Sequence, residues 1–218
     1  MRLRLSLRLL ALCAALVVVS PALAEEKKAE EGFTPLFNGK DLTGWKTFLK
    51  DKDADATKTW TVKDGVLHCT GKPFGYFYSD KSFKNYVIRY DWRYPAEQPE
   101  KTTLNSGLLI HIQEPHKVWP KCLEAQGAYA NHGKIYFVSG AKEVGKATED
   151  VDARKKALKP KEEWHTTEVT CKADGSLVVK INGVEVATGK SELTEGPIGF
   201  QSEGAAIEFR NIRIKELK

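Results

Sequence analysis

Residues 177–186 read LVVKINGVEV, and this stretch indicates the fold more directly than any other part of the chain. Apolar and β-branched residues stand on both sides of Asn182-Gly183, a dipeptide that tolerates the positive φ angles of a type I′ turn. The stretch therefore predicts two antiparallel strands joined by a two-residue hairpin.

Turn signals of the same kind recur at Asn38-Gly39, Asp64-Gly65 and Asp174-Gly175. Short apolar or alternating runs predict further strands at residues 60–62, 66–70, 76–79, 86–94, 107–113, 122–126, 134–138, 164–171, 198–201 and 206–214. Helical periodicity is confined to residues 151–158, inside a Lys- and Glu-rich segment (141–163) that we expect to be an exposed insertion bordering a groove. The pattern predicts an all-β fold, an antiparallel two-sheet sandwich or jelly roll.

The first 24 residues, MRLRLSLRLLALCAALVVVSPALA, have the layout of a cleavable secretory signal. Three arginines precede an apolar run too short to span a bilayer, and Ala22-Leu23-Ala24 supplies the cleavage site. An uncleaved anchor is the alternative. Residues 25–32 are interpreted as a charged tether and residues 33–218 as one domain, so we expect an exported protein, periplasmic or extracellular, with no membrane-spanning segment after cleavage.

Charge and cysteine spacing exclude two kinds of site. Loss of the signal lowers the formal net charge from +5 to about +2, and lysines are interleaved with acids, so no nucleic-acid surface is expected. Three cysteines remain, Cys69, Cys122 and Cys171, without the C-x-x-C spacing of zinc sites. They can form one disulfide plus a free thiol, or pack as three small apolar residues.

The best candidate site lies between residues 86 and 126. If the three strands predicted there are neighbours, alternation gathers seven polar residues on one sheet face: Arg89, Asp91, Arg93, His111, Gln113, Glu124 and Gln126. An ordinary solvated face is the alternative. Lysine is the commonest cation of the chain yet is absent from these positions, and the side chains present favour planar, bidentate hydrogen bonds to sugar hydroxyls and carboxylates.

Within this set, Glu124 and His111 are the acid–base candidates, since a desolvated Glu or a His titrates near neutral pH. A structural role for His111, bonded to Asp91 or Glu124, is the alternative. Trp119 lies in a loop where it could stack on a sugar ring or pack in the core, and His132 lies in a turn that could overhang the groove. His111, Glu124 and Asp91 together could bind a divalent cation, although no spacing motif specifies one.

The chain lacks the sequence motifs of several enzyme classes. It has no G-x-S-x-G nucleophile elbow, no P-loop and no G-x-G-x-x-G. The carboxylate ladder E-x-D-x-x-E of laminarinase-type sandwich glycosidases is absent too, so a glycosidase with two carboxylates flanking the scissile bond has no motif support.

A series of motifs resembles one known family. In order they are FTPLFNGKDLTGW (33–45), Trp60 with DGVL (64–67), the 86–94 strand, NSG (105–107), LEAQ (123–126), Trp164 with ING (181–183), and GPIGFQSEGAAIEFRNIRIKEL (196–217). Together these resemble the 3-keto-disaccharide hydrolase family, also described as 3-keto-glucoside lyase/hydratase, from Gly32 to Leu217. The resemblance implies a concanavalin A-like lectin/glucanase sandwich and a carbohydrate substrate.

The resemblance also implies a mechanism. A C3 ketone acidifies the C2 proton, so a base can remove it, the C1 substituent leaves by β-elimination, and water adds across the glucal. Glu124 or His111 would then serve as base and acid, Arg93 or a bound cation would stabilise the enolate, and Asn105, Gln113 and Gln126 would orient hydroxyls. The chain departs from the family at His111, where Arg is usual, and at 127–129, where an Asp is missing that Asn131 could replace.

Two other functions remain open from the sequence. The same fold and face would serve a carbohydrate-binding, lectin-like module without turnover, and the departure at His111 favours that alternative. A structural, envelope-associated protein whose polar face pairs with a partner is the third.

Overall fold

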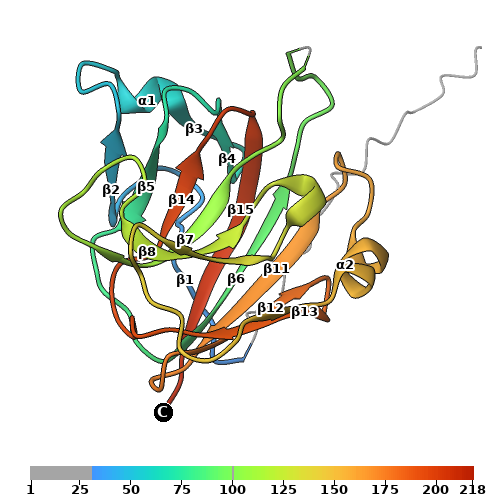
Figure 1. Ribbon diagram of the computed structural model, residues 1–218. Coiled ribbons are helices and arrows are strands. Elements are labelled where there is room, and N and C mark those ends of the chain that lie inside the picture. The colour runs from blue at the N-terminus through green and yellow to red at the C-terminus, as the bar shows by residue number, and fades with distance from the viewer. Residues whose placement is uncertain (1–30, 100) are drawn as a thin grey trace, which may run out of the picture. The chain divides into compact units, whose positions relative to one another are not determined.

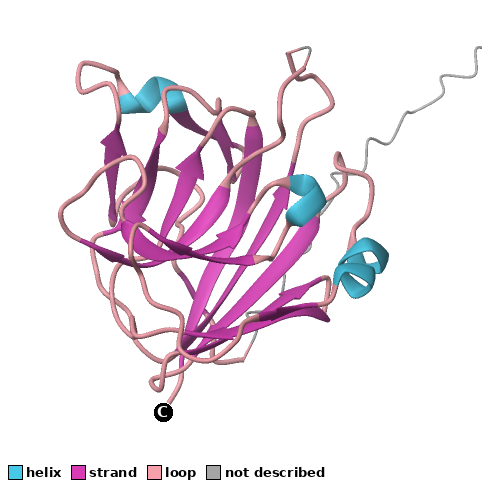
Figure 2. Cartoon of the chain, viewed as in Figure 1, coloured by secondary structure: helices cyan, strands magenta, loops and turns pink. Residues whose placement is uncertain are grey.

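The protein is described from a computed structural model that covers residues 31–99 and 101–218. The predicted signal (1–24) and most of the predicted tether (25–32) lie outside the described residues. Figure 2 shows two layers of strands, with short helices only at the edges. They are α1 (Ala56–Thr59), α2 (Val151–Ala157) and a single 3-10 turn at Tyr129–Asn131.

The larger layer is a nine-stranded antiparallel sheet, with β1 (Thr34–Pro35) paired to β15 (Ile207–Glu216). Its remaining strands run in the order β10 (Thr148–Glu149), β13 (Val184–Lys190), β12 (Ser176–Ile181), β11 (His165–Cys171), β6 (Tyr86–Arg93), β15, β4 (Val66–Cys69) and β3 (Trp60–Lys63). The predicted hairpin at Asn182-Gly183 is confirmed, with Asn182 at φ 49° and Gly183 at φ 84°.

The smaller layer has six strands in the order β2 (Trp45–Leu49), β5 (Gly75–Ser79), β14 (Gly199–Ser202), β7 (Gly107–Gln113), β8 (Lys121–Gln126) and β9 (Ile135–Val138) (Figure 1). All its pairings are antiparallel. The predicted two-sheet sandwich is therefore confirmed.

Alternation along the strands places one face of each sheet in a shared core. On β6, Tyr90 and Trp92 are buried in this core, and the ring of Tyr90 lies 5.0 Å from that of Phe200 of β14. Each such apolar side chain contributes roughly 1.5–3 kcal/mol by leaving water. Trp92 is stacked between His132 and His165, with ring centroids 3.9 and 4.2 Å away.

The segment predicted as an insertion extends the larger sheet. β10 pairs with the edge strand β13, and α2 packs against the same strand. Asp150 caps the helix by accepting a hydrogen bond from the Ala153 N–H at 2.8 Å. The segment thus lies along β13, in the sheet that does not contain Glu124.

The three cysteines of the described residues form no disulfide. Cys69, Cys122 and Cys171 are buried free thiols. Burial raises the pKa of Cys69 to about 11 and of Cys171 to about 12, so neither is a reactive thiolate near neutral pH.

In the described part of the chain, no helix has the length and hydropathy needed to cross a bilayer.

Candidate functional site

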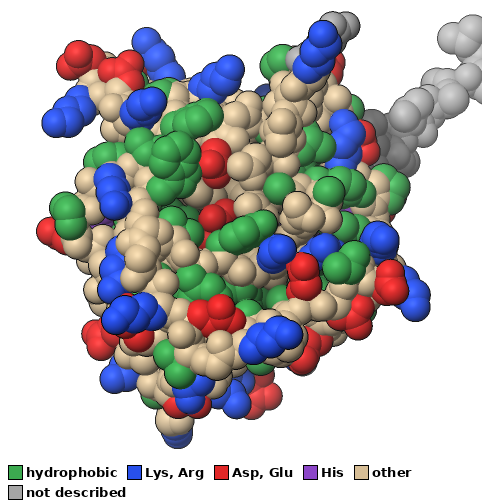
Figure 3. Space-filling model, in the orientation of Figure 1, with side chains coloured by type: hydrophobic (Ala, Val, Ile, Leu, Met, Phe, Trp, Pro, Cys, Tyr) green, Lys and Arg blue, Asp and Glu red, His purple; other side chains and the backbone are tan. Residues whose placement is uncertain are grey.

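Glu124 lies on the outward face of the six-stranded sheet, here called the Glu124 face. Strand register places Tyr78, Gly199, Leu109, Glu124 and Tyr136 in one row across five strands of that face. The next row joins Phe48, Tyr76 and Gln201 on β2, β5 and β14, and pairs Gly107 with Gln126 on β7 and β8. Figure 3 shows acidic side chains over β14 and β7, surrounded by hydrophobic and uncharged ones.

Two acceptor atoms meet over Gly107 at the centre of this face. Glu124 is 7% exposed and Gln201 2% exposed, and the Oε1 atom of each is buried without a recorded hydrogen-bond partner. A Cβ at Gly107 would lie 2.5 Å from Oε1 of Glu124 and 2.2 Å from Oε1 of Gln201. The glycine therefore makes room for both, and the pair is an unsatisfied polar site on an exposed sheet face.

Burial changes the acidity of Glu124. Desolvation raises the pKa of its carboxyl to about 8, and the negative charge of nearby Glu203 adds to the effect. Glu203, directly after β14, also has a raised pKa because it is partly buried, although the indole N–H of Trp119 donates a hydrogen bond to its Oε1 at 3.0 Å. Near neutral pH the face therefore offers the protonated carboxyl of Glu124 beside a second carboxyl, that of Glu203, whose pKa burial also raises and the Trp119 N–H lowers only in part.

The loop from Glu114 to Pro120, between β7 and β8, lies across this face (Figure 1). The ring of His116 contacts Tyr76 and Tyr78 of β5, and the hydroxyl of Tyr76 lies 2.9 Å from His116 Nδ1. Trp119 then reaches Glu203 while its indole stays 49% exposed. Trp119 is thus available for stacking on a ligand, one of the two predicted roles, and is not a core residue.

Two predicted substrate-binding residues, Gln126 and Asn105, belong to β8 and to the segment just before β7. Gln126 is on the Glu124 face, but its amide oxygen accepts the Ala128 N–H at 2.7 Å. Asn105 stands two residues before Gly107, and its Oδ1 is buried without a recorded partner. Gln113 lies farther off, at the end of β7, where its amide donates to the carbonyl oxygens of His111 and Glu195.

The prediction that Arg89, Asp91 and Arg93 share a face with Glu124 is wrong. β6 belongs to the nine-stranded sheet, so these side chains project from the opposite outer surface of the sandwich. Arg89 pairs with Glu168 and Arg93 with Glu208, the latter at 2.5 Å. Asp91 accepts hydrogen bonds from Thr166 and Asn211. They form a structural ion-pair network far from Glu124, because the core of the sandwich lies between.

The two predicted site histidines are also placed elsewhere. A bulge interrupts β7 between Ile110 and Gln113, and His111 takes a φ of 55°, so its ring turns inward against Tyr86, 5.8 Å away. Burial lowers the pKa of His111 to about 4, and Nδ1 lies 3.1 Å from the Leu193 carbonyl. His132 does not overhang a groove, because it is buried against Trp92 and lies 2.8 Å from the Thr167 hydroxyl.

The predicted cation site does not assemble. His111 turns into the core, and Asp91 and Glu124 stand on opposite outer surfaces of the sandwich. Among the described residues, no group of three His, Cys, Asp or Glu side chains is arranged to hold a metal ion.

Gln201 and Glu203 are the residues that the sequence analysis missed. Both lie in the motif GFQSEG, which contributed only to the family resemblance. Strand alternation could have identified them. In GFQSE every second residue from Gly199 points to the same side of the strand, so Gln201 and Glu203 face outward with Gly199, whereas Phe200 faces the core.

The protein is a two-sheet antiparallel β-sandwich with a buried carboxyl on the outer face of its smaller sheet. The sequence matches the 3-keto-α-glucoside-1,2-lyase-like domain family over residues 32–215, so the chain belongs to that family. Membership indicates a carbohydrate-active function of the glycosyl hydrolase type. No curated protein sequence matches the chain.

Solved structures agree with this assignment. A candidate glycosyl hydrolase from Parabacteroides distasonis is 27% identical, with a TM-score of 0.62 and coverage of 86% of this chain and 95% of that one. A second from the same organism is 22% identical, with a TM-score of 0.61 and coverage of 85% and 99%. The Bacillus licheniformis β-glucanase shares the fold, at 12% identity, a TM-score of 0.52 and coverage of 85% and 97%.

Proposed function

We propose that the Glu124 face cleaves 3-keto-glycosides by elimination followed by hydration. The observation that carries the proposal is the buried carboxyl of Glu124, whose pKa of about 8 keeps it protonated at neutral pH beside the second carboxyl of Glu203. Two carboxyl groups in different environments are the usual basis for dividing acid and base roles. Membership in a 3-keto-α-glucoside-1,2-lyase-like family supports the substrate.

The acid and base roles are assigned from the different surroundings of the Glu124 and Glu203 carboxyls. The Glu203 carboxylate accepts the C2 proton of the 3-keto sugar, the electron pair forms the C1–C2 double bond, and the C1–O bond breaks. Glu124 donates its proton to the departing oxygen. In the second half, water adds its hydroxyl to C1 and a proton returns to C2, so that the net reaction is hydrolysis.

Neutral donors stabilise the developing enolate oxygen in this scheme. The amide of Gln201 is buried next to Glu124, and a half-turn of that amide exchanges its oxygen for the N–H₂ group. Asn105 supplies a second buried amide. These groups replace the arginine or cation expected from the sequence, since Arg93 and His111 point elsewhere.

A deuterium experiment tests the proposal. Purified protein is incubated in D₂O with a panel of 3-keto-glycosides and with the parent glycosides that carry a C3 hydroxyl, with and without a chelator. We expect cleavage of the keto compounds alone, with deuterium at C2 of the released sugar, because the proton removed there exchanges with solvent. Equal cleavage of the parent glycosides, or a product without C2 deuterium, would show direct glycosidic hydrolysis instead.

Carbohydrate binding without turnover is the second candidate. The exposed rings of Trp119 and Tyr136 on the Glu124 face favour it, since both could stack on sugars. Saturable binding of an oligosaccharide with no product after long incubation would decide for this candidate.

We also propose that the protein is exported, on the signal-like layout of residues 1–24. The expected mature N-terminus is Glu25. Mass spectrometry of the protein expressed with its own leader tests this, and a mature chain that still begins at residue 1 or 2 would contradict it.

A further inference from the structure

A hollow opens on the six-stranded sheet, and Glu124 is not among the residues that line it. It has a volume of about 530 Å³, within the range of about 300–1,000 Å³ typical of small-molecule sites. Tyr78 in its wall lies three strands from Glu124 in the same row, about 14 Å away by strand spacing. The ring of His116 borders it, 4.5 Å from the ring of Tyr78, and is fixed on its other side by the Tyr76 hydroxyl.

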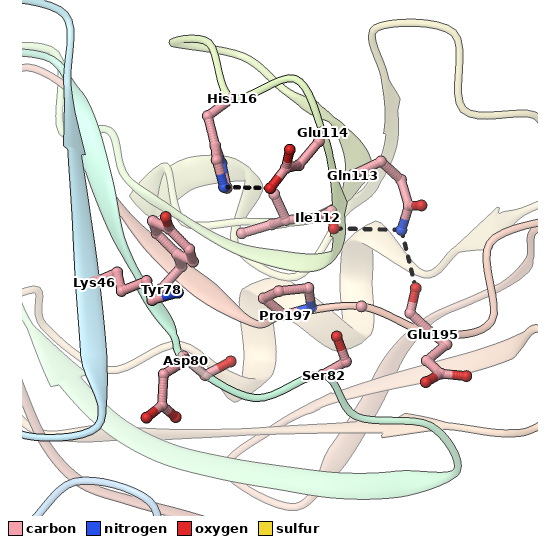
Figure 4. Close-up of a pocket in the computed structure, with 12 residues that line it drawn as sticks. Lys46, Tyr78, Asp80, Ser82, Ile112, Gln113, Glu114, His116, Glu195 and Pro197 are labelled. Carbon is pink, nitrogen blue, oxygen red and sulfur yellow. Dashed lines mark hydrogen bonds and ion pairs between the residues drawn. The ribbon is translucent and has the colours of Figure 1, made fainter.

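The lining combines an apolar floor with polar groups around it. Figure 4 shows Pro197 and Ile112 in the centre, with Tyr78 and Lys46 on one side and Ser82 and Glu195 on the other. Among the described residues, no hydrogen bond or ion pair is recorded for the side chains of Lys46, Asp80, Ser82 and Glu195. These four side chains are exposed to solvent. An apolar floor with an aromatic wall, ringed by solvated hydrogen-bonding groups, matches the C–H face and hydroxyl edge of a pyranose.

The charge of the residues that line the hollow limits the class of sugar that can bind there. Asp80, Glu114 and Glu195 contribute three carboxylates, against the single ammonium of Lys46. The charge of Glu114 is felt inside the hollow, because it adds to the burial that raises the pKa of Tyr78. A negatively charged sugar would be repelled, whereas carboxylates are good acceptors for sugar hydroxyls.

We propose that this hollow is a second carbohydrate-binding site, which takes an uncharged pyranose and lies on the same outer sheet face as Glu124, with Tyr78 in its wall three strands away. It does not depend on the proposed reaction. Such a site would hold the protein on a glycan while the Glu124 face acts on another part of it, or would bind sugar even if the Glu124 face has no activity.

Binding measurements by ¹⁵N NMR test the proposal. The probes are neutral trisaccharides (maltotriose, cellotriose and mannotriose) and trigalacturonate as the charged counterpart. We expect at least one neutral probe, and not trigalacturonate, to shift the amide signals of Ile112, Ser82 and Gly196. The double variant Asp80→Ala/Glu195→Ala should weaken this binding by about tenfold or more, because it removes two charged acceptors.

Two controls distinguish binding in the hollow from binding at Glu124 and from an effect of net charge. Asp152→Ala/Glu185→Ala removes the same charge from exposed positions in α2 and β13 and should change the affinity by less than about twofold. Glu124→Gln should leave the shifts at Ser82 and Gly196 intact. The proposal is overturned if no neutral probe shifts these signals, if trigalacturonate binds better, or if both double variants weaken binding equally.

Discussion

Replacing Gly107 with alanine should disable the Glu124 face while leaving the sandwich folded. The added Cβ would lie 2.2 Å from Oε1 of Gln201 and 2.5 Å from Oε1 of Glu124, whereas non-bonded carbon contacts need about 3.5 Å. Both side chains must therefore shift by about 1 Å. The atoms in the way are the ends of side chains and not backbone, so the sheet can keep its register.

The size of the effect follows from that displacement. A misplacement of about 1 Å in a catalytic group reduces turnover by about 100-fold, because the reacting atoms leave their near-attack geometry. Overpacking of this kind costs about 1–3 kcal/mol of unfolding free energy. A domain of ordinary stability, about 5–15 kcal/mol, stays folded after such a loss, so turnover should fall while the protein remains folded.

The assay compares kcat/KM on a 3-keto-glycoside with the thermal midpoint measured on the same preparation. Gly189→Ala is the matched control, a strand glycine of β13 whose added Cβ would have its nearest neighbour, a side-chain carbon of Ile135, at 3.2 Å. It should keep activity within about twofold of the parent protein. Full activity of Gly107→Ala would refute the placement of the reaction over Gly107.

Three further predictions concern charge and stacking. The kcat/KM of the parent protein should fall as the pH rises through about 8, where the Glu124 carboxyl loses the proton it must donate, and a rate that climbs through that pH would contradict the acid role. Trp119→Ala should raise KM by about tenfold and Trp119→Phe should restore most of the loss, because the half-exposed indole serves stacking; an unchanged KM would remove it from the site. Burial lowers the pKa of His132 to about 3, below its ordinary value near 6.5, so the unfolded chain binds more protons and the thermal midpoint should fall as the pH drops from 6.5 toward 3. His132→Phe should flatten that fall, and an equally steep one would assign the acid sensitivity to other groups.

Local sequence signals predicted the strands well, because strand formation here depends on alternation and turn chemistry. The hairpin at Asn182-Gly183 and the inward side of β6, with Tyr90 and Trp92, both follow from period-two patterning. The five-residue strand β2 and the two-residue strands β1 and β10 were not predicted, and for β1 and β10 the reason is that two residues carry no period.

The assembly of the site was less predictable, because alternation assigns a residue to a face of its strand but not to a sheet. Arg89 and Arg93 do face outward, as predicted, yet from the other layer. The bulge in β7 reverses the orientation of His111. The sequence pattern does not show where a one-residue bulge shifts the alternation of side chains, so this reversal could not be predicted. Glu124 was identified because its acceptor chemistry stands out in an apolar strand.

The central claim, that a buried Glu124 carboxyl drives cleavage of 3-keto-glycosides, is tested most directly by Glu124→Gln. The amide keeps the shape of the carboxyl but has no acidic proton, and general acid catalysis contributes about 10²–10⁴-fold. Turnover of a 3-keto-glycoside by the folded variant should therefore fall by at least about 100-fold. Turnover equal to that of the parent protein would contradict the account.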